Sequence, residues 1–159
     1  MVENYRTTAL DELGLGYKAL SAINPKLIYC SITGFGATGS KAKINAYDNV
    51  IQASSGIINQ SGGHKPGVSF VDYATGLEAA FAISAALFRA ERAGIGAHIS
   101  VSMYETALLM MAPEAAREKN KHNDPNQLEA GIKTYPTQQG ELCLGAFTPL
   151  QMSQCLSAL

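Results

Sequence analysis

The feature that most limits how this chain can fold is one long apolar segment, residues 73–92. Its spacing predicts a helix with one face formed by Leu77, Ala80, Phe81, Ser84, Leu87 and Phe88. The opposite face holds alanines at positions 79, 82, 85 and 86. A helix that is apolar nearly all round is packed on more than one side. Only 16% of the residues are charged, so we expect further chain or a partner subunit to cover more of the surface than usual.

Two short segments near this helix have the pattern of strands. Residues 26–32 are apolar and bounded by turn signals, which is typical of a buried strand in a parallel sheet. Residues 97–102 alternate between polar and apolar side chains. Helical patterns at 9–20, 46–58 and 103–112 lie before, between and after the two strands. We therefore predict an α/β fold, with a parallel sheet that has too few strands to be complete.

Local signals refine this outline. Gly14 and Gly16 weaken the first helix, which we expect to form two short pieces. Residues 59–67 are predicted to be a loop and residues 68–71 a short extended piece. The long helix is then expected to begin after Asp72 and to end at Gly94 and Gly96, which are typical helix stop signals.

The composition changes after residue 112. Residues 113–127 are charged, rich in asparagine and bounded by prolines, which predicts a linker. Beyond it we expect a strand at 142–147 after a turn at 138–140, and a helix that begins near Pro149. The chain is thus expected to contain part of one domain, residues 1–112, and the beginning of a second, residues 128–159.

Charge and cysteine content argue against several classes of function. Lys and Arg number 12 and Asp and Glu number 13, which leaves no basic surface for nucleic acid or an anionic membrane. The apolar stretch 79–88 is too short to span a bilayer, and no apolar leader begins the chain. Cys30, Cys143 and Cys155 form no ligand pattern, so we expect packed, reduced thiols in a cytoplasmic protein without a metal site.

Asp72 is the first candidate for chemistry. An aspartate before a helix commonly caps the free N–H groups of the first turn. The same position favours the ionised carboxylate, which could attack an acyl carbonyl as a nucleophile. The two interpretations use one geometry and do not exclude each other. Asp48 stands at the start of another predicted helix, where it could be a helix-start charge.

The glycine-rich loop 33–39 follows the first buried strand, at the end where open α/β sheets bind ligands. It contains the string G-x-G-x-x-G, but Lys41 and Lys43 follow where a dinucleotide site needs a helix. We therefore expect close approach of some ligand without a dinucleotide cofactor. The histidines, at positions 64, 98 and 122, lack the spacing of metal ligands and are expected to be structural or solvated.

Several motifs in a fixed order resemble one enzyme family. They are Val2-Glu-Asn-Tyr-Arg6, Leu10-Asp-Glu-Leu-Gly-Leu-Gly-Tyr17, Asn24-Pro-Lys-Leu-Ile-Tyr-Cys-Ser-Ile-Thr-Gly-Phe-Gly36, Asp72-Tyr-Ala-Thr-Gly76 and Arg89-Ala-Glu-Arg-Ala-Gly-Ile-Gly-Ala-His-Ile-Ser-Val-Ser-Met103. With these motifs the chain resembles the family III CoA-transferases, which include formyl-CoA, carnitine and succinyl-CoA transferases. The resemblance covers almost the whole chain.

This resemblance implies a reaction and a set of site residues. Asp72 matches the family's catalytic aspartate, which attacks an acyl-CoA thioester, forms an aspartyl-CoA thioester and passes the CoA to an acceptor acid. The residues implied to bind the CoA or the acyl group are Asn4, Tyr5, Gly34, Phe35, Tyr47, Asp48 and Met103. The implied substrates are an acyl-CoA and a carboxylic acid, with coenzyme A as substrate and no tightly bound cofactor.

The resemblance also implies an assembly. Family members are more than twice as long, with a Rossmann-like large domain and a small α+β domain, and two chains interlock into a homodimer. This chain would then hold part of the large domain and the start of the small one. A truncated, inactive fragment that only self-associates, for example through exposed sheet edges, is the alternative.

Two departures from the family pattern affect the choice of reaction. Glu12 stands where many members have an arginine, so a phosphate contact would be lost or taken over by Arg6 or Lys41. The glycine run of formyl-CoA transferases is missing from residues 123–131, which argues against a formyl/oxalate enzyme. The family's racemases use a His-Asp pair where this chain has Tyr47-Asp48. Because tyrosine, with a pKa of about 10, is a poor base at neutral pH, we favour a transferase over a racemase.

Overall fold

The computed structural model describes residues 1–119 and 132–157. The contacts within the chain divide it into two units, Met1–Ala116 and Arg117–Leu159. The centre of the first unit is a three-stranded sheet with the order β1-β2-β3, in which both strand pairs are parallel. The strands are β1 (Val2–Glu3), β2 (Ile28–Thr33) and β3 (Ala97–Ser102). The predicted α/β fold and both predicted strands are confirmed.

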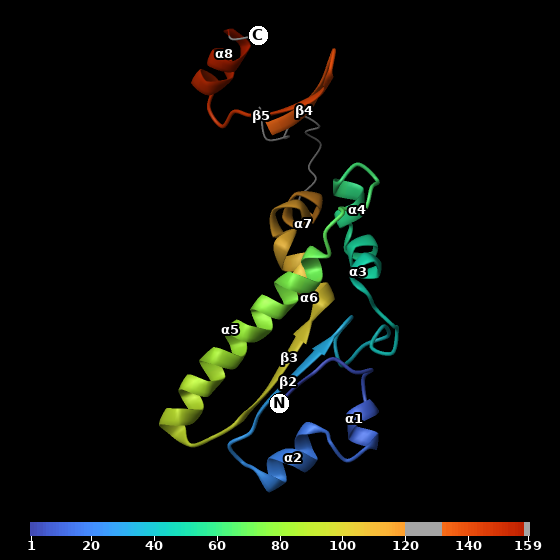
Figure 1. Ribbon diagram of the computed structural model, residues 1–159, viewed down its shortest axis with the longest axis vertical. Coiled ribbons are helices and arrows are strands. Elements are labelled where there is room, and N and C mark those ends of the chain that lie inside the picture. Colours follow the sequence, from blue (N-terminus) through green and yellow to red (C-terminus); the bar gives the residue numbers. More distant parts are fainter. Residues whose placement is uncertain (120–131, 158–159) are drawn as a thin grey trace. The chain divides into compact units, whose positions relative to one another are not determined.

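Helices connect these strands (Figure 1). Between β1 and β2 lie α1 (Ala9–Glu12) and α2 (Tyr17–Ile23), the two pieces expected from the glycines. Between β2 and β3 lie α3 (Asp48–Ser55), α4 (Ile57–Gln60) and α5 (Phe70–Ala93), and after β3 follow α6 (Met103–Met110) and α7 (Ala112–Lys119). The prediction of one helix over 46–58 is wrong, because Gly56 adopts a left-handed conformation with φ +93° and separates α3 from α4.

The alternation of side chains gives the sheet two different faces. On one face, Cys30 and Val101 are buried against Ala79 of α5, and Figure 1 shows this helix running along the strands. On the other face, Tyr17 of α2 stacks on His98 of β3, with ring centroids 4.7 Å apart. His98 therefore has a structural role, as expected from its isolation in the sequence.

The long helix α5 starts earlier than predicted. Phe70 and Val71 belong to its first turn. The prediction of an extended piece over 68–71 is therefore wrong for these two residues. The physical reason is tertiary, since Val71 is fully buried in a core cluster with Ile51, Ile57, Met103 and Ala107. Asp72 is consequently the third residue of α5 and not its N-cap. The N-cap position belongs to Ser69, whose side chain makes no capping bond.

One side of α5 has no cover within the described residues. Its buried residues are Val71, Thr75 and Ala79, whereas an outer stripe is 60–78% exposed and consists of Tyr73, Leu77, Phe81 and Phe88. The expectation that this helix packs on more than one side is therefore not met by these residues alone. By length and composition, α5 could cross a membrane, but core helices of soluble proteins pass the same test. Here its inner side packs on the sheet.

The predicted linker, residues 113–127, begins as a helix. Helix α7 occupies its first part because Pro113 stands in the first turn, where no N–H is needed. Glu114 near its start and Arg117 and Lys119 near its end also suit the helix dipole. The remainder of that linker, with His122, and the segment 123–131, which lacks the glycine run of formyl-CoA transferases, lie outside the described residues.

The second unit contains a hairpin and a helix in its described part. Strands β4 (Ile132–Thr137) and β5 (Gly140–Gly145) are antiparallel and joined by the predicted turn. Helix α8 (Pro149–Ser157) begins at the predicted proline. The expected strand 142–147 starts two residues earlier, and its partner β4 is an element that the sequence pattern does not predict. Cys143 is exposed, contrary to the expectation of a packed thiol, whereas Cys30 is buried, and burial raises the pKa of its thiol.

Candidate active site

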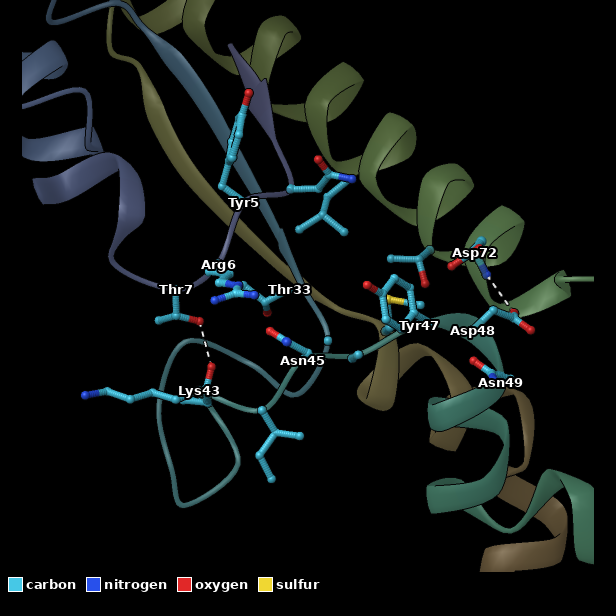
Figure 2. Close-up of a pocket in the computed structure, with 18 of the residues that line it drawn as sticks. Tyr5, Arg6, Thr7, Thr33, Lys43, Asn45, Tyr47, Asp48, Asn49 and Asp72 are labelled. Atoms are coloured by element: carbon cyan, nitrogen blue, oxygen red, sulfur yellow. Dashed lines mark hydrogen bonds between the residues drawn. The ribbon is translucent and has the colours of Figure 1, made fainter. Parts of the chain in front are cut away.

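A cavity of about 1080 Å³ lies where the three parallel strands end (Figure 2). Its walls come from the segment after β1, the end of β2, the loop 42–47, the starts of α3 and α5, and the first residue of α6. The carboxyl ends of parallel strands are where open α/β sheets bind ligands. Seven of the eight predicted site residues line this cavity: Asn4, Tyr5, Gly34, Tyr47, Asp48, Asp72 and Met103.

Phe35 is the exception among the residues expected to contact CoA. It does not line the cavity and packs against the core cluster, with its ring centroid 5.6 Å from that of Tyr104. The Lys41 ammonium lies 5.3 Å from the centre of the Phe35 ring. Phe35 and Lys41 thus pack against each other, and the expected contact of Phe35 with the nucleotide stays a prediction.

Asp72 presents an exposed carboxyl to the cavity from the first turn of α5. Partial burial of the carboxyl, together with the negative charge of Asp48, raises its pKa above the ordinary value. The dipole of α5 acts in the opposite sense, because the positive end of a helix favours an ionised carboxylate. An accessible carboxylate with these neighbours is chemically equipped to attack an electrophilic carbonyl.

Asp48 has a different environment, since its side chain is only 5% exposed. Its Oδ1 accepts hydrogen bonds from the backbone N–H groups of Val71 at 3.0 Å and Asp72 at 3.3 Å, the second of which Figure 2 shows. Its Oδ2 accepts from Gln52 Nε2 and lies 3.9 Å from the Lys65 ammonium. Asp48 is therefore the carboxylate that caps α5, a helix other than its own.

Gln52 holds this arrangement from the interior. Its side chain is fully buried, and its Nε2 donates to Asp48 and, at 3.3 Å, to the carbonyl of Val68. Both partners only accept, so the orientation of the amide is settled by its neighbours. Gln52 thereby ties Asp48 to the segment that leads into α5.

A close backbone contact brings Tyr47 and Asp48 to the end of β2. A Cβ atom on Gly34 would lie 2.1 Å from the Cβ of Ala46, so only glycine allows this approach. The Gly34 carbonyl also accepts from the N–H of Tyr104 at 2.9 Å. The glycine loop therefore serves packing at the site, and no helix follows it to form a dinucleotide site.

The remaining predicted contacts have unequal accessibility. Tyr5 and Tyr47 are 64% and 71% exposed and can reach a ligand in the cavity. Met103 is 9% exposed and belongs to the core cluster, so its main contacts are with Ile51, Val71 and their neighbours. Met103 therefore forms part of the cavity wall.

Cations line the cavity together with the carboxylates. Arg6, Lys43 and Lys65 contribute to its lining, as does Glu12, which accepts a hydrogen bond from Thr8 Oγ1 at 3.1 Å. Of the two cations considered as replacements for the family arginine, Arg6 lines the cavity and Lys41 does not. The sequence patterns do not single out Lys65. The only available signal is its place in a glycine-rich loop shortly before Asp72.

The described residues contain no cluster of three or more His, Cys, Asp or Glu side chains that could hold a metal ion. The chemistry available in the cavity is that of an accessible carboxylate, a buried carboxylate, cations and phenols. These groups suit acyl transfer to and from Asp72.

Comparison with known proteins shows that this chain is similar to CoA-transferases. It is 40% identical over 117 residues to a succinate–glutarate CoA-transferase of Agrobacterium fabrum, an alignment that covers 70% of this chain and 29% of the relative. It is 34% identical over 156 residues to a succinyl-CoA:glutarate CoA-transferase of Mus musculus, covering 91% and 36%. A CaiB/BaiF family protein from Brucella suis has the same fold, with a TM-score of 0.79, 33% identity and coverage of 99% and 44%.

The chain thus spans about a third of the length of the curated relatives that it matches. A model of one family matches it from end to end, over residues 1–159. Together with the α/β fold and the sequence motifs around Asp72, this match assigns the chain to CoA-transferase family III.

Proposed function

We propose that this chain forms part of an enzyme that transfers CoA from an acyl-CoA to a carboxylic acid, with Asp72 as the covalent nucleophile. The observation that carries the proposal is the exposed Asp72 carboxyl in a cavity of about 1080 Å³ at the strand ends of a family III chain. The relatives are named CoA-transferases, which supports the reaction class.

The proposed reaction proceeds by carboxylate attack in two symmetrical halves. Asp72 attacks the thioester carbonyl, the C–S bond breaks, and CoA leaves as a thiolate from the resulting mixed anhydride. The thiolate then attacks the Asp72 acyl carbon, which releases the donor acid and leaves an aspartyl-CoA thioester. The acceptor carboxylate repeats these steps in reverse and departs as the new CoA ester, so that Asp72 is regenerated and no net proton is consumed.

For the acids, we propose dicarboxylates such as succinate and glutarate. The names of the relatives support this choice, and Arg6, Lys43 and Lys65 provide cations in the same cavity for the anionic groups of both substrates. Asn4 and Tyr5 are proposed to contact CoA, and Tyr47 the acyl group. Coenzyme A acts here as a substrate, with no tightly bound cofactor.

The assembly remains a proposal as well. We propose a cytoplasmic homo-oligomer, in which residues 1–112 belong to a large domain and residues 128–159 begin a small one. The outer stripe of α5 supports this view, because its apolar side chains are 60–78% exposed in the single chain.

The test is to trap the intermediate on Asp72. The purified chain is incubated with succinyl-CoA, digested and analysed by mass spectrometry, with D72N as the control. We expect a CoA adduct on the peptide that contains Asp72, and no adduct in D72N. Exchange of an α-proton of the acyl group without transfer of CoA would contradict the proposal and identify a racemase.

A binding measurement separates the transferase from an inactive fragment. Titration of CoA into the 159-residue chain, followed by calorimetry, should show weak binding, because relatives are more than twice as long. Submicromolar affinity would contradict the view that further chain completes the site. Absence of both binding and adduct would favour the inactive fragment.

A further inference from the structure

Among the described residues that line the cavity, Lys65 is a cation that forms an ion pair with a carboxylate, that of Asp48. Its ammonium lies 3.9 Å from Asp48 Oδ2, and it donates a hydrogen bond of 2.7 Å to the carbonyl of Pro66, which holds the head group in place. Its side chain is 37% exposed, whereas that of Asp48 is 5% exposed. Because Asp48 is buried and Lys65 is partly exposed, water screens this pair less than a pair with both partners on the surface.

Asp48 connects Lys65 to Asp72. One oxygen of Asp48 is next to Lys65, and the other accepts the backbone N–H of Asp72 at 3.3 Å. The negative charge of Asp48 opposes the ionisation of the Asp72 carboxyl. Asp72 must be ionised to act as a nucleophile, so a cation that compensates the charge of Asp48 favours the reactive form.

We propose that Lys65 is a positioning residue that neutralises Asp48 and thereby allows Asp72 to carry its negative charge. This inference rests on the proposed role of Asp72 as the nucleophile. Lys43 and Arg6 line the same cavity, but among the described residues neither forms an ion pair with Asp48. Lys65 is therefore distinguished from the other cations by its contact and not merely by its charge.

The charged and titratable groups around Asp72 set the balance of charge at its carboxyl. Those that line the cavity with it, from every element that contributes to the wall, are Tyr5, Arg6, Glu12, Lys43, Tyr47, Asp48 and Lys65. Tyr73 is its neighbour on α5, and α6, which packs beside α5, carries Tyr104 and Glu105. Since phenols are neutral near pH 7, the relevant balance is between three carboxylates of the wall, at Glu12, Asp48 and Asp72, and its three cations.

The test measures the titration of the Asp72 carboxyl directly, by carbon-detected NMR of the whole 159-residue chain. In K65M, the midpoint should move upward by on the order of half a pH unit, because the charge of Asp48 is no longer compensated. K65R should remain within about 0.2 unit of the wild type, since it keeps the cation. K43M removes the same charge from the cavity and should also leave the midpoint within about 0.2 unit. Equal shifts in K65M and K43M, or no shift in K65M, would overturn the proposal.

A double mutant tests whether Lys65 acts through Asp48. In a D48N background, K65M should no longer move the Asp72 midpoint, because there is no charge left to compensate. An unchanged effect of K65M in that background would show direct action on Asp72 and overturn the positioning role. If K65M does not fold, K65Q serves in its place, and a thermal melt confirms the fold of each variant.

The rate of adduct formation supplies a second readout. If Asp72 forms the CoA adduct, the acid limb of its pH profile should move upward in K65M by the same amount as the NMR midpoint. A wild-type chain that forms no adduct would count against the proposed function alone, since the NMR titration does not depend on activity. A normal adduct in all variants with identical pH profiles would count against Lys65 alone.

Discussion

The two carboxylates of the cavity differ in what surrounds them. Asp48 is 5% exposed and meets two backbone N–H groups, an amide donor and an ammonium. Asp72 is exposed to the cavity, and the partners that influence it are the start of α5 and Asp48 itself. At the scale of single residues, Asp48 therefore stabilises the structure, and the carboxylate of Asp72 is accessible for reaction.

The raised pKa of Asp72 leads to a prediction about stability. Because partial burial and Asp48 raise its pKa in the folded state, ionised Asp72 opposes folding, and its cost is fully present above the folded pKa. The cost disappears as the pH falls below the unfolded value, near 3.8. D72N should therefore melt at a higher temperature than the wild type at pH 7, with a difference that vanishes toward pH 3. Thermal melts across this range, followed by circular dichroism, provide the measurement, and a D72N chain that melts lower at pH 7 would contradict it.

The same substitution should remove the proposed activity. Without a carboxylate at position 72, the covalent route is closed, and we expect CoA transfer to fall by at least about 1,000-fold, as for other covalent nucleophiles. The measurement is the rate at which CoA passes from succinyl-CoA to labelled glutarate. D72N thus separates stability from activity, since the two are expected to change in opposite directions.

The capping role of Asp48 predicts a local effect. D48A leaves the N–H groups of Val71 and Asp72 and the Lys65 ammonium without their carboxylate, and we expect a loss of about 2 kcal/mol in unfolding free energy. Urea unfolding gives this energy, and faster amide exchange at Val71 and Asp72 gives its location. S69A is the matched control, because Ser69 occupies the N-cap position without a capping bond, and it should cost less than about 0.5 kcal/mol.

At the scale of elements, the site depends on how closely the loop after β2 approaches the start of α3. The contact between Gly34 and Ala46 sets this distance, and α3 in turn carries Asp48 to the start of α5. Three elements that are separate in sequence thus meet around one carboxylate.

A substitution at the contact should separate them. In G34A, the new Cβ would lie 2.1 Å from Ala46 Cβ, so the loop must move, and we expect a cost of about 1–3 kcal/mol. G67A is the control, since nothing lies within 4 Å of its added Cβ, and it should change stability by less than about 0.5 kcal/mol. Urea unfolding compares the two. Equal stability of both variants would show that the loop adapts without strain.

At the scale of the whole molecule, the apolar outer stripe of α5 is an exposed surface of the first unit. Leu77 and Phe81 are 73% and 78% exposed, and contiguous apolar patches of this kind mark interfaces or aggregation sites. Their position on the helix that carries Asp72 connects the assembly to the site, because a partner that covers this stripe also supports α5.

The stripe predicts the behaviour of the chain in solution. L77E/F81E should reduce self-association, observed by sedimentation velocity, because it places two charges on the apolar surface. Its unfolding free energy should stay within about 0.5 kcal/mol of the wild type, since both side chains are exposed in the single chain. A double variant that associates as strongly as the wild type would indicate association through the sheet edges instead.

Local patterns are sufficient to predict most of the elements. The predicted strand at Ala97–Ser102 matches the structure to the residue, because alternation is a property of neighbouring side chains. The errors occur at boundaries that distant contacts decide, such as the start of α5, where burial of Val71 in the core extends the helix. The sequence pattern does not predict β4. This strand forms by pairing with β5, which is a contact between two segments of the chain.

Local periodicity is enough to predict the α/β class, and the order of residue types is enough to recognise the family motifs and to single out Asp72. Only the tertiary structure decided that Asp48 caps α5 across 23 residues of chain, that Lys65 faces Asp48 and that Phe35 turns to the core. These relations arise from packing between distant segments, and a side chain's neighbours across a fold leave no periodic signal in its own segment.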